Sequence, residues 1–425
     1  MTATAPTEEL APRGPGVAPQ DPLTERFGRL PTWARWLTYL VGGVLVLSVA
    51  KAVSGVEPLT AANTFRSALE LSIPIGMAAL GGLWSERAGV VNIGLEGMMI
   101  LGTWFGAWGA IEYGPWWGVV LGVVGGAVGG LLHAIATVSF GVDHIVSGVA
   151  INILALGTTN FLTTIAYDDA TNSSPTIPGT IGRVDLLPFL KTPLENLAEQ
   201  GRFFLSDLAG LILGLTTDIS WIVIIALLLL PVTWFVLWRT PFGLRLRSVG
   251  EDPEAAETLG VPVYTMKYVA VIVSGALSGL GGVALVLMFS GQFQNGQTNG
   301  RGFIGLAAMI FGNWQVGGLV LGAGLFGFMD AMQSQVDEAA HAILLVAALL
   351  SALLAFRALL RRRWTVAAIV AAVALGFFVW YASSDAIPTE LIPFLPHLTT
   401  LAVLVFSAQR LRPPAADGRI FRRSR

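Results

Sequence analysis

Cysteine is absent from the 425 residues of this chain, and lysine and histidine are rare. Without cysteine, a disulfide framework, a thiolate metal site and a cysteine nucleophile are all excluded. The scattered histidines offer no metal-ligand spacing; they are His133, His144, His341 and His397. None of the lysines follows a glycine; they are Lys51, Lys191 and Lys267. The phosphate-binding motif G-x-x-x-x-G-K-[ST] is therefore missing, which excludes ATP hydrolysis by that route.

Charged residues are also scarce, at only 12% of the chain. A typical soluble domain contains about twice that share. Hydrophobic residues account for 54% before the 50 glycines are added, so too little polar surface exists for a solvated globular protein. The composition likewise excludes a disordered chain, a coiled coil and a nucleic-acid-binding domain, which needs a basic field. The net charge of −2 indicates no acidic or basic partner. What remains is an all-α integral membrane protein in a lipid bilayer.

Twelve apolar stretches are candidates for membrane spans, which need about 20 residues each. They lie at roughly 36–53, 62–83, 91–110, 116–137, 144–166, 220–238, 267–289, 302–313, 316–333, 341–360, 364–382 and 390–408. The stretch 302–313 is too short for a relaxed span, and Gly312 and Asn313 interrupt it. It fits half of a broken helix or a re-entrant hairpin that lines a pathway, because non-helical backbone at membrane depth needs protein or water around it. A tight glycine-rich turn between two packed spans is the alternative.

Arginines predict the orientation of these spans. Arg26, Arg29 and Arg35 precede the first span and place the N-terminus in the cytoplasm by the positive-inside bias. Threading the chain from there puts the other arginine clusters inside and the stretch 167–219 outside, which favours an even number of spans. The predicted parts are a disordered cytoplasmic tail at 1–31, a transmembrane domain at 32–409, and a basic cytoplasmic tail at 410–425.

A short capped helix is predicted in the cytoplasmic connection 239–266. Asp252 is a good N-cap, Pro253 suits the first helical position, and Glu254 is favoured at the positive end of a helix. Gly260 is a typical residue at which such a helix ends. The helix would lie outside the membrane with small residues exposed, and would suit the docking of a soluble partner. The alternative is a solvated loop that only joins two spans.

Polar side chains in apolar helices are candidates for lining a solute path, because they are costly in lipid unless they are paired or face a cavity. Asn92 and Glu96 are four residues apart and share a helix face. For Glu96 the alternative is an acid at a helix end, stabilised by the helix dipole. The complete set of path candidates is Asn92, Glu96, Asn152, Asn160 and Asn313.

Glycine recurs at every fourth position in two of the predicted spans. The residues are Gly118, Gly122, Gly126 and Gly130, and then Gly275 and Gly279. This spacing places small residues on one helix face and predicts close contact between helix backbones. It says little about the substrate.

Three segments of the chain, in order, resemble the permease subunits of ABC importers for nucleosides and related simple-sugar compounds. That family is related to the ribose and branched-chain amino acid permeases. The segments are SERAGVVNIGLEGMM at 85–99, TPFGLRLRSVGEDPEAAETLGV at 240–261 and GFIGLAAMIFGNW at 302–314. The second is similar to the family's coupling loop, which docks on the ATPase subunit. The likeness covers roughly 60–335 and resumes at about 388–408.

The resemblance implies a type II ABC importer permease fold, with about ten core helices and an inserted pair of spans at 341–385. The implied solute is a nucleoside or a related sugar-containing compound. The implied partners are an ATPase subunit, a second and different permease chain, and an extracytoplasmic substrate-binding lipoprotein, all at the plasma membrane. No catalytic residue, cofactor, metal ion or nucleic acid is expected. The residues expected to couple to the ATPase are Asp252, Pro253, Glu254, Ala255, Ala256, Glu257, Thr258 and Gly260.

A secondary transporter of the twelve-span facilitator type is the main alternative. The run ERAG at 86–89 resembles the D-R-x-G motif of that family. However, Val90 and Val91 stand where basic residues are expected next, and no large central cytoplasmic loop separates two halves. A membrane enzyme would need clustered His, Asp or Arg side chains at an interface, and the sequence has no such cluster.

Overall fold

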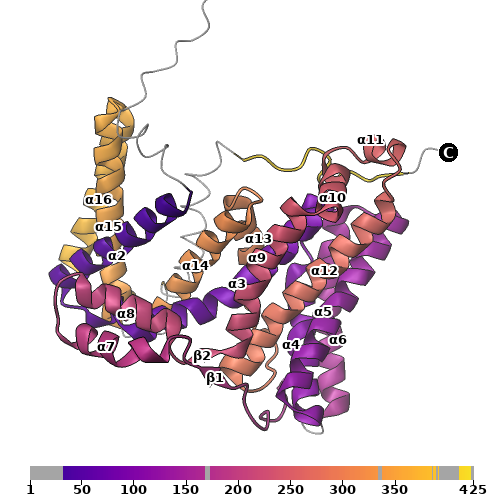
Figure 1. Ribbon diagram of the computed structural model, residues 1–425, viewed down its shortest axis with the longest axis horizontal. Coiled ribbons are helices and arrows are strands. Elements are labelled where there is room, and N and C mark those ends of the chain that lie inside the picture. Colours follow the sequence, from indigo (N-terminus) through magenta and orange to yellow (C-terminus); the bar gives the residue numbers. More distant parts are fainter. Residues whose placement is uncertain are drawn as a thin grey trace, which may run out of the picture.

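Helices form almost all of the described structure (Figure 1). The computed structural model describes residues 32–167, 173–333, 337–384, 386–388, 391 and 411–422. The expected tail at 1–31 and nearly all of the expected last span at 390–408 lie outside the described residues. Within the described residues, the prediction of an all-α membrane protein is confirmed.

The helices follow one another with short connections. They are α2 (Thr32–Ser54), α3 (Ala62–Arg87), α4 (Leu95–Tyr113), α5 (Pro115–Ala134), α6 (His144–Ala166), α7 (Pro188–Glu199), α8 (Leu205–Thr216), α9 (Trp221–Arg239), α10 (Pro241–Glu251), α11 (Pro253–Thr258), α12 (Val263–Ala284), α13 (Arg301–Phe311), α14 (Val316–Gln333), α15 (Asp337–Leu360) and α16 (Trp364–Ser383). Two short strands, β1 (Arg183–Val184) and β2 (Ile219–Ser220), pair antiparallel with Arg183 opposite Ser220.

Nine of the described helices are long and apolar enough to cross a membrane. These are α2, α3, α5, α6, α9, α12, α14, α15 and α16, with α5 and α12 extended by π-helical turns. Two more predicted spans are helices that fall outside this group: α4, with 19 residues, and α13, with only 11. The multi-pass character of the chain therefore agrees with the prediction, whereas two of the expected crossings are not simple apolar helices.

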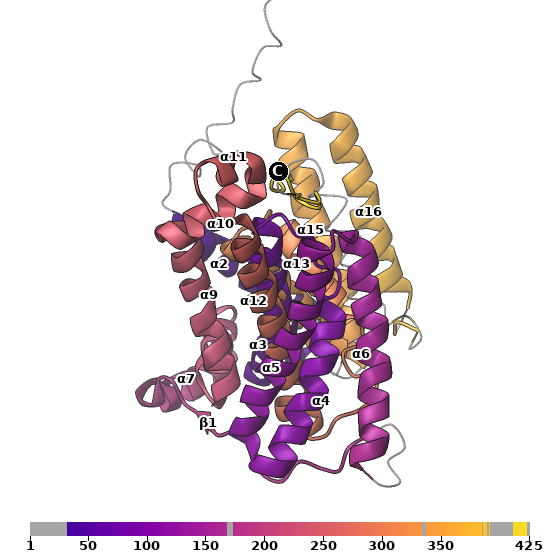
Figure 2. The ribbon, with the colours of Figure 1, turned by 90° about the vertical axis from the view of Figure 1, so that its right-hand side faces the viewer.

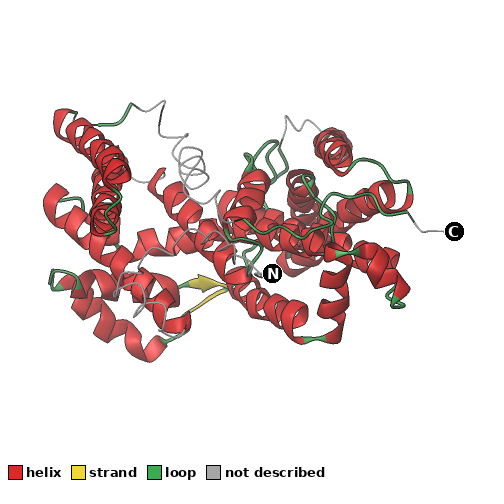
Figure 3. Ribbon diagram, turned by 90° about the horizontal axis from the view of Figure 1, so that it is seen from above, coloured by secondary structure: helices red, strands yellow, loops and turns green. Residues whose placement is uncertain are grey.

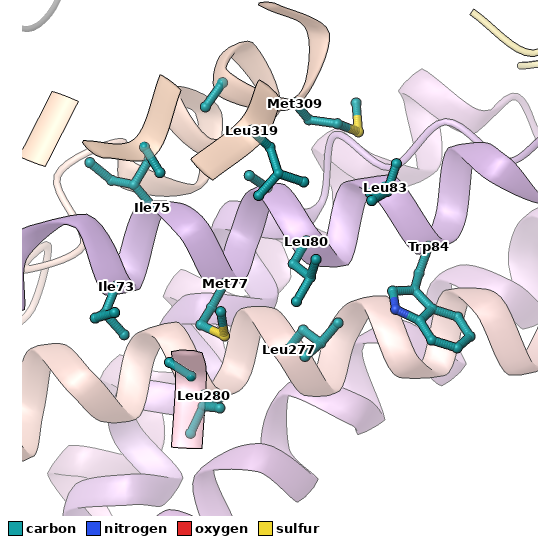
Figure 4. Close-up of a cluster of buried hydrophobic side chains, with 14 of the residues drawn as sticks. Ile73, Ile75, Met77, Leu80, Leu83, Trp84, Leu277, Leu280, Met309 and Leu319 are labelled. Carbon is teal, nitrogen blue, oxygen red and sulfur yellow. The ribbon is translucent and has the colours of Figure 1, made fainter. Parts of the chain in front are cut away.

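The core of the bundle is built around α3. This helix packs against α12 and α14 along its length and also contacts α13. Met77 and Leu80 of α3 point toward Leu277 and Leu280 of α12, while Leu319 of α14 lies on the other side of α3 (Figure 4). Because lipid tails are as apolar as these side chains, helix association in a bilayer depends on close van der Waals packing rather than on removal from water.

Glycines bring α5 and α12 into backbone contact. A Cβ atom on Gly126 would overlap the carbonyl oxygen of Gly275, and a Cβ on Gly275 would overlap the carbonyl oxygen of Gly126. One turn along, a Cβ on Gly279 would lie 2.6 Å from the carbonyl oxygen of Gly122, while a Cβ on Gly122 would overlap the side chain of Val283 on α12. The predicted close packing at this glycine spacing is confirmed.

The region 302–333 is an antiparallel hairpin of α13 and α14 with a short first arm. Gly312 packs against the backbone of Gly318 across the turn. Asn313 and Trp314 in the turn have φ values of 54° and 53°. A positive φ is uncommon outside glycine, so this tight turn needs contacts that hold it. The structure thus combines the short helix and the tight turn that the sequence left as alternatives.

The two ends of the bundle carry different elements (Figures 1 and 2). α10 and α11 lie at one end, while α7, α8 and the two strands lie at the other. At the second end Arg183 pairs with both Glu70 and Asp218, which links β1 to α3 and β2. α2, α15 and α16 pack together beside the bundle.

Candidate functional site

The helix α11 forms where the capping residues predicted it. The Oδ1 atom of Asp252 accepts the backbone N–H groups of Glu254 at 3.1 Å and Ala255 at 3.0 Å. Pro253 occupies the first helical position, and Gly260, with φ of 80°, follows the end of the helix. These local hydrogen bonds satisfy donors that a helix start otherwise leaves unpaired. The predicted short helix is therefore confirmed.

One face of α11 is buried and the other is open. Ala256 packs against α10 and α12 in a cluster with Val249 and Met266. Ala255 on the opposite face is exposed, and Leu259 just after the helix is 84% exposed. An exposed leucine beside small residues is an apolar surface that a partner could cover.

The helix α10 places α11 directly against the bundle. A Cβ on Gly250 would overlap the carbonyl oxygen of Arg87, the last residue of α3. One turn earlier in α10, the guanidinium of Arg247 donates to the carbonyl oxygen of Leu237 at 2.9 Å. α10 is thus held against both α3 and α9.

Three of the predicted path residues meet at the start of α4, and two of them are amides. The chain entering α4 is not helical, so its backbone groups need partners. Asn152 of α6 supplies two of these partners. Its Oδ1 accepts the N–H of Gly97 at 2.7 Å, and its side-chain NH2 group donates to the carbonyl of Ile93 at 3.1 Å. Asn92 is fully buried and donates to the hydroxyl of Ser274 on α12 at 2.9 Å.

Glu96, in the first turn of α4, is the third path residue at this place. Its carboxylate is 7% exposed and accepts the N–H groups of Gly300 at 2.9 Å and Gly302 at 2.6 Å. One carboxylate therefore lies at the starts of both α4 and α13, where the positive ends of helix dipoles favour a negative charge. A Cβ on Gly302 would lie 2.6 Å from the Cα of Glu96, so this approach requires glycine.

One acceptor in this polar centre has no partner among the described residues. It is Oδ1 of Asn92, which is buried. Leaving a buried polar atom unpaired costs about 1–3 kcal/mol. A donor from outside the chain, such as a hydroxyl or an amino group, would therefore be favoured next to Asn92.

The other two path candidates lie elsewhere. Asn160 is on α6, two turns beyond Asn152, and its backbone carbonyl accepts the hydroxyl of Thr164 at 3.0 Å. Asn313 lies in the turn between α13 and α14, where its side-chain oxygen accepts the N–H of Arg412 at 2.7 Å. The structure thus brings three of the five candidates together and separates the other two from them.

Comparison with known proteins identifies the family to which this chain belongs. Residues 65–354 match the family described as the permease component of branched-chain amino acid transport systems, which is more than half of the chain. The chain belongs to this permease family. This membership argues for the importer permease and against the facilitator-type alternative.

Individual relatives of this permease are ABC transporter subunits. It is 39% identical to a guanosine ABC transporter permease protein, NupQ, of Bacillus subtilis over 62% of this chain and 79% of that protein. It is 37% identical to a nucleoside ABC transporter permease protein, NupC, of Lactococcus lactis over 61% of this chain and 78% of that protein. A second guanosine permease protein of B. subtilis, NupP, is 26% identical over 60% of this chain and 69% of that protein. No solved structure matches the chain.

The permease also contains a buried carboxyl pair that the sequence did not reveal. Glu86, only 3% exposed, accepts the indole N–H of Trp314 at 2.6 Å, and the carboxyl of Asp417 lies beside it. Two carboxylates repel each other at close range, so this proximity favours a proton on one of them. Burial raises the pKa of Asp417 to about 6. Lys267, 2% exposed, lies nearby and reaches the carbonyl of Gly89 at 3.5 Å.

Of this pair, only Glu86 lies in a recognisable sequence motif. Glu86 lies in the ERAG run that was compared with another transporter family, whereas Asp417 lies in a stretch expected to be a solvated basic tail. A long-range contact between residues more than three hundred positions apart leaves no local pattern.

Proposed function

We propose that this chain is the membrane-spanning permease subunit of an ATP-driven importer whose solute is a nucleoside. The observation that carries the proposal is its 39% identity with a guanosine permease protein over 79% of that protein's length. The missing phosphate-binding motif assigns ATP hydrolysis to a separate subunit. The permease then provides the solute path and the docking site for that subunit.

The docking element in this proposal is α11, together with its cap and the residue that ends it. Its exposed face fits a groove on the ATPase, and α10 passes the resulting displacement to α3. Contact between Gly250 and the last carbonyl of α3 supports this route. The proposed docking residues are Asp252, Pro253, Glu254, Ala255, Glu257, Thr258 and Gly260, whereas Ala256, which was expected among them, is buried and holds α11 to the bundle.

A second permease and a binding lipoprotein complete the proposed complex. The chain resembles two different guanosine permease proteins of one organism, NupQ at 39% and NupP at 26% identity. Unequal likeness to two such chains supports a pair of unlike permeases. The complex would lie in the plasma membrane, with α10, α11 and both termini of this chain in the cytoplasm, and the lipoprotein would bind at the end that carries α7 and α8.

The proposed solute path passes the polar centre at the starts of α4 and α13. Support comes from the unpartnered Oδ1 atom of Asn92, which could accept a hydrogen bond from a ribose hydroxyl or a base amino group. Asn160 and Asn313 remain candidates at other levels of the path. Variants with Asn92→Leu and Glu96→Gln would test this part of the proposal by guanosine transport.

The proposal is tested by reconstituting the permease in proteoliposomes with its ATPase, its second permease and its binding lipoprotein. Guanosine uptake should require hydrolysable ATP and should persist when ionophores collapse ion gradients. Uptake that follows an ion gradient without ATP would contradict the proposal, as would uptake of a non-nucleoside solute to the exclusion of nucleosides.

Docking through α11 is tested in the same system with Ala255→Arg. The bulky charge should reduce both uptake and the stimulation of ATP hydrolysis by about tenfold, equivalent to about 1.4 kcal/mol of coupling. The matched control is Arg361→Glu, which changes the charge at an exposed position between α15 and α16, outside α11 and outside the end that carries α7 and α8, and should leave uptake unchanged. Normal uptake by Ala255→Arg would refute this docking site.

A further inference from the structure

Residues 411–422, named here the C-terminal strap, cross the end of the bundle that carries α10 and α11. Figure 1 shows this segment in yellow running to those helices, and Figure 3 shows it from above as the loop that leads to the label C. The segment contains no helix or strand. The sequence predicted a basic cytoplasmic tail at 410–425, and nothing in that prediction indicated specific contacts.

The strap binds the two helices proposed to meet the ATPase. The N–H of Ala416 donates to the carbonyl of Gly250 at the end of α10, at 2.9 Å. Phe421 packs against the apolar cluster that contains Ala256 of α11 and Val249 of α10, and its ring centre lies 5.8 Å from that of Tyr264 on α12. A displacement of α10 and α11 therefore acts on the strap through both a backbone hydrogen bond and an apolar contact.

The same strap contacts two connections between helices, the one between α3 and α4 and the turn between α13 and α14. Its Arg412 N–H donates to the side chain of Asn313 in the turn between α13 and α14, at 2.7 Å. In the connection between α3 and α4, a Cβ on Gly89 would lie 3.1 Å from the carbonyl oxygen of Ala416. A Cβ on Gly418 would lie 3.4 Å from the side chain of Val91.

Asp417 fixes the middle of the strap to the bundle. Its carboxyl, with one oxygen buried, lies beside Glu86 in the last turn of α3 and beside Lys267 of α12. Glu86 in turn accepts the indole N–H of Trp314, whose positive φ marks the tight turn after α13. A continuous chain of contacts therefore runs from the strap through α3 to the hairpin turn.

We propose that the C-terminal strap carries the displacement of α10 and α11 to the α3–α4 connection and to the α13–α14 turn at the same time. Asp417 is the positioning residue that holds the strap in place. This inference rests on the proposed function, because it assigns a route for coupling between ATPase and solute path. Connections between helices are where backbone can rearrange without breaking a regular helix, and the strap is bound to these two.

The first experiment removes the strap from the reconstituted complex by truncation after Arg410. The matched control is truncation after Arg422, which removes only residues that follow the strap. We expect the strapless complex to hydrolyse ATP within about twofold of the intact complex, while guanosine uptake per ATP falls by about tenfold. The control should keep the intact ratio. An unchanged ratio, or an equal fall in uptake and hydrolysis, would overturn the inference.

The second experiment keeps the chain complete and changes only Asp417. Asp417→Asn keeps a polar side chain of the same shape beside Glu86, whereas Asp417→Leu places an apolar one there. We expect Asp417→Leu to lower the ratio of uptake to hydrolysis as truncation does, and Asp417→Asn to restore most of it. If Asp417→Leu transports as the intact chain does, Asp417 has no positioning role.

A solute-independent readout separates this inference from the proposed function. Because the chain has no cysteine, Gln315→Cys gives a single thiol at an exposed position of the α13–α14 turn. Its labelling rate by a maleimide should change when ATP is added to the intact complex, and this change should vanish in the Asp417→Leu background. If the labelling rate still changes with ATP in the Asp417→Leu background, the proposed role of the strap is refuted. If it does not change with ATP in the intact complex, the proposed coupling to an ATPase is refuted.

Discussion

The helices at the centre of the permease and the helices beside it have similar composition but opposite surroundings. In α3 and in α12, 78% of the apolar span is buried inside the protein, against 17% in α2 and 11% in α16. All four are apolar enough to cross a membrane. Hydropathy alone therefore does not separate a helix that forms the core of the bundle from one whose surface is left for lipid or for another chain.

Glycine distinguishes the two regions by its spacing and contacts. Gly126 in α5 and Gly275 in α12 have each other's backbone where a side chain would be. For Gly42 in α2 and Gly376 in α16, no atom of the described residues lies within 4 Å of the place that a Cβ would take. The central helices are consequently fixed by backbone contact, whereas the outer helices tolerate larger residues at their glycines. Substitutions in the two regions can break or sharpen this contrast.

The largest effect is expected at Glu96, where two helix starts share one carboxylate. Glu96→Leu leaves the N–H groups of Gly300 and Gly302 without their acceptor. Hydrogen bonds to a charged group contribute about 1.5–3 kcal/mol each, so we expect a loss of about 3–6 kcal/mol in unfolding free energy. Denaturant unfolding of the purified permease in detergent, followed by tryptophan fluorescence, would measure this loss.

Two control substitutions test whether a large loss of stability is specific to Glu96 and to the centre of the bundle. Glu96→Gln keeps one acceptor oxygen and should lose about half as much. In the outer region, His341→Leu removes a hydrogen bond to Ser384 at 3.3 Å and a ring stack on Tyr381, and should cost less than about 3 kcal/mol. Equal losses for Glu96→Leu and His341→Leu would remove the distinction between the two regions.

The capped helix α11 could be predicted from the sequence because its stabilising groups are adjacent. Asp252, Pro253 and Gly260 act within one or two turns, and the structure has the expected cap. The shared role of Glu96 could not be predicted in the same way, because its partners lie two hundred positions away and are backbone N–H groups of glycine. A backbone donor carries no residue-specific signal.

Contacts between distant segments could be predicted from the sequence only where they depend on a repeating pattern of residues. The glycine spacing predicted that α5 would have a close neighbour, and it has two: Gly126 and Gly130 meet α12, and Gly118 meets α4. The strap had no comparable pattern, since Asp417 and Phe421 lie among prolines and arginines that are typical of solvated tails. Their burial depends on where the ends of α3, α10 and α12 come together, which only the fold determines.

The next effect concerns the glycine contact itself. Gly126→Ala forces a methyl group onto the backbone of α12 near Gly275 and Gly279. Because backbone cannot move aside as a flexible side chain can, α5 and α12 must separate, at a cost of about 1–3 kcal/mol. The thermal unfolding midpoint of the purified permease should fall accordingly. An unchanged midpoint would show that the two helices can move apart freely.

A smaller, pH-dependent effect is expected where the strap meets the bundle. The pKa of Asp417 is raised to about 6 by burial, with Glu86, Arg87 and Lys267 facing its carboxyl. A raised pKa means that the protonated carboxyl stabilises the folded strap. That contribution is complete below about pH 4, the ordinary value for aspartate, and is lost as the pH rises through about 6. Stability should therefore fall across this window.

Limited proteolysis near Arg419 measures this dependence, since an arginine in a well-held strap is cut slowly. Cleavage by trypsin should accelerate between about pH 4.5 and pH 6.5 by more than the protease's own activity on an unfolded peptide standard. Asp417→Asn should flatten the profile. A cleavage site in the outer region, at Arg361 between α15 and α16, should follow the standard at every pH. Identical profiles at the two arginines would contradict the prediction.

The smallest effect is expected in the outer helix α16, and it has the opposite sign. Gly376 lies inside this helix with open space around it. Gly376→Ala adds a methyl group without a clash and removes backbone freedom from the unfolded chain, which favours the helix by about 0.5–1 kcal/mol. The unfolding midpoint should rise slightly, whereas the same change at Gly126 lowers it. A clear loss of stability in Gly376→Ala would mean that α16 packs as closely as the central helices, against another chain of the assembled complex if not against this one.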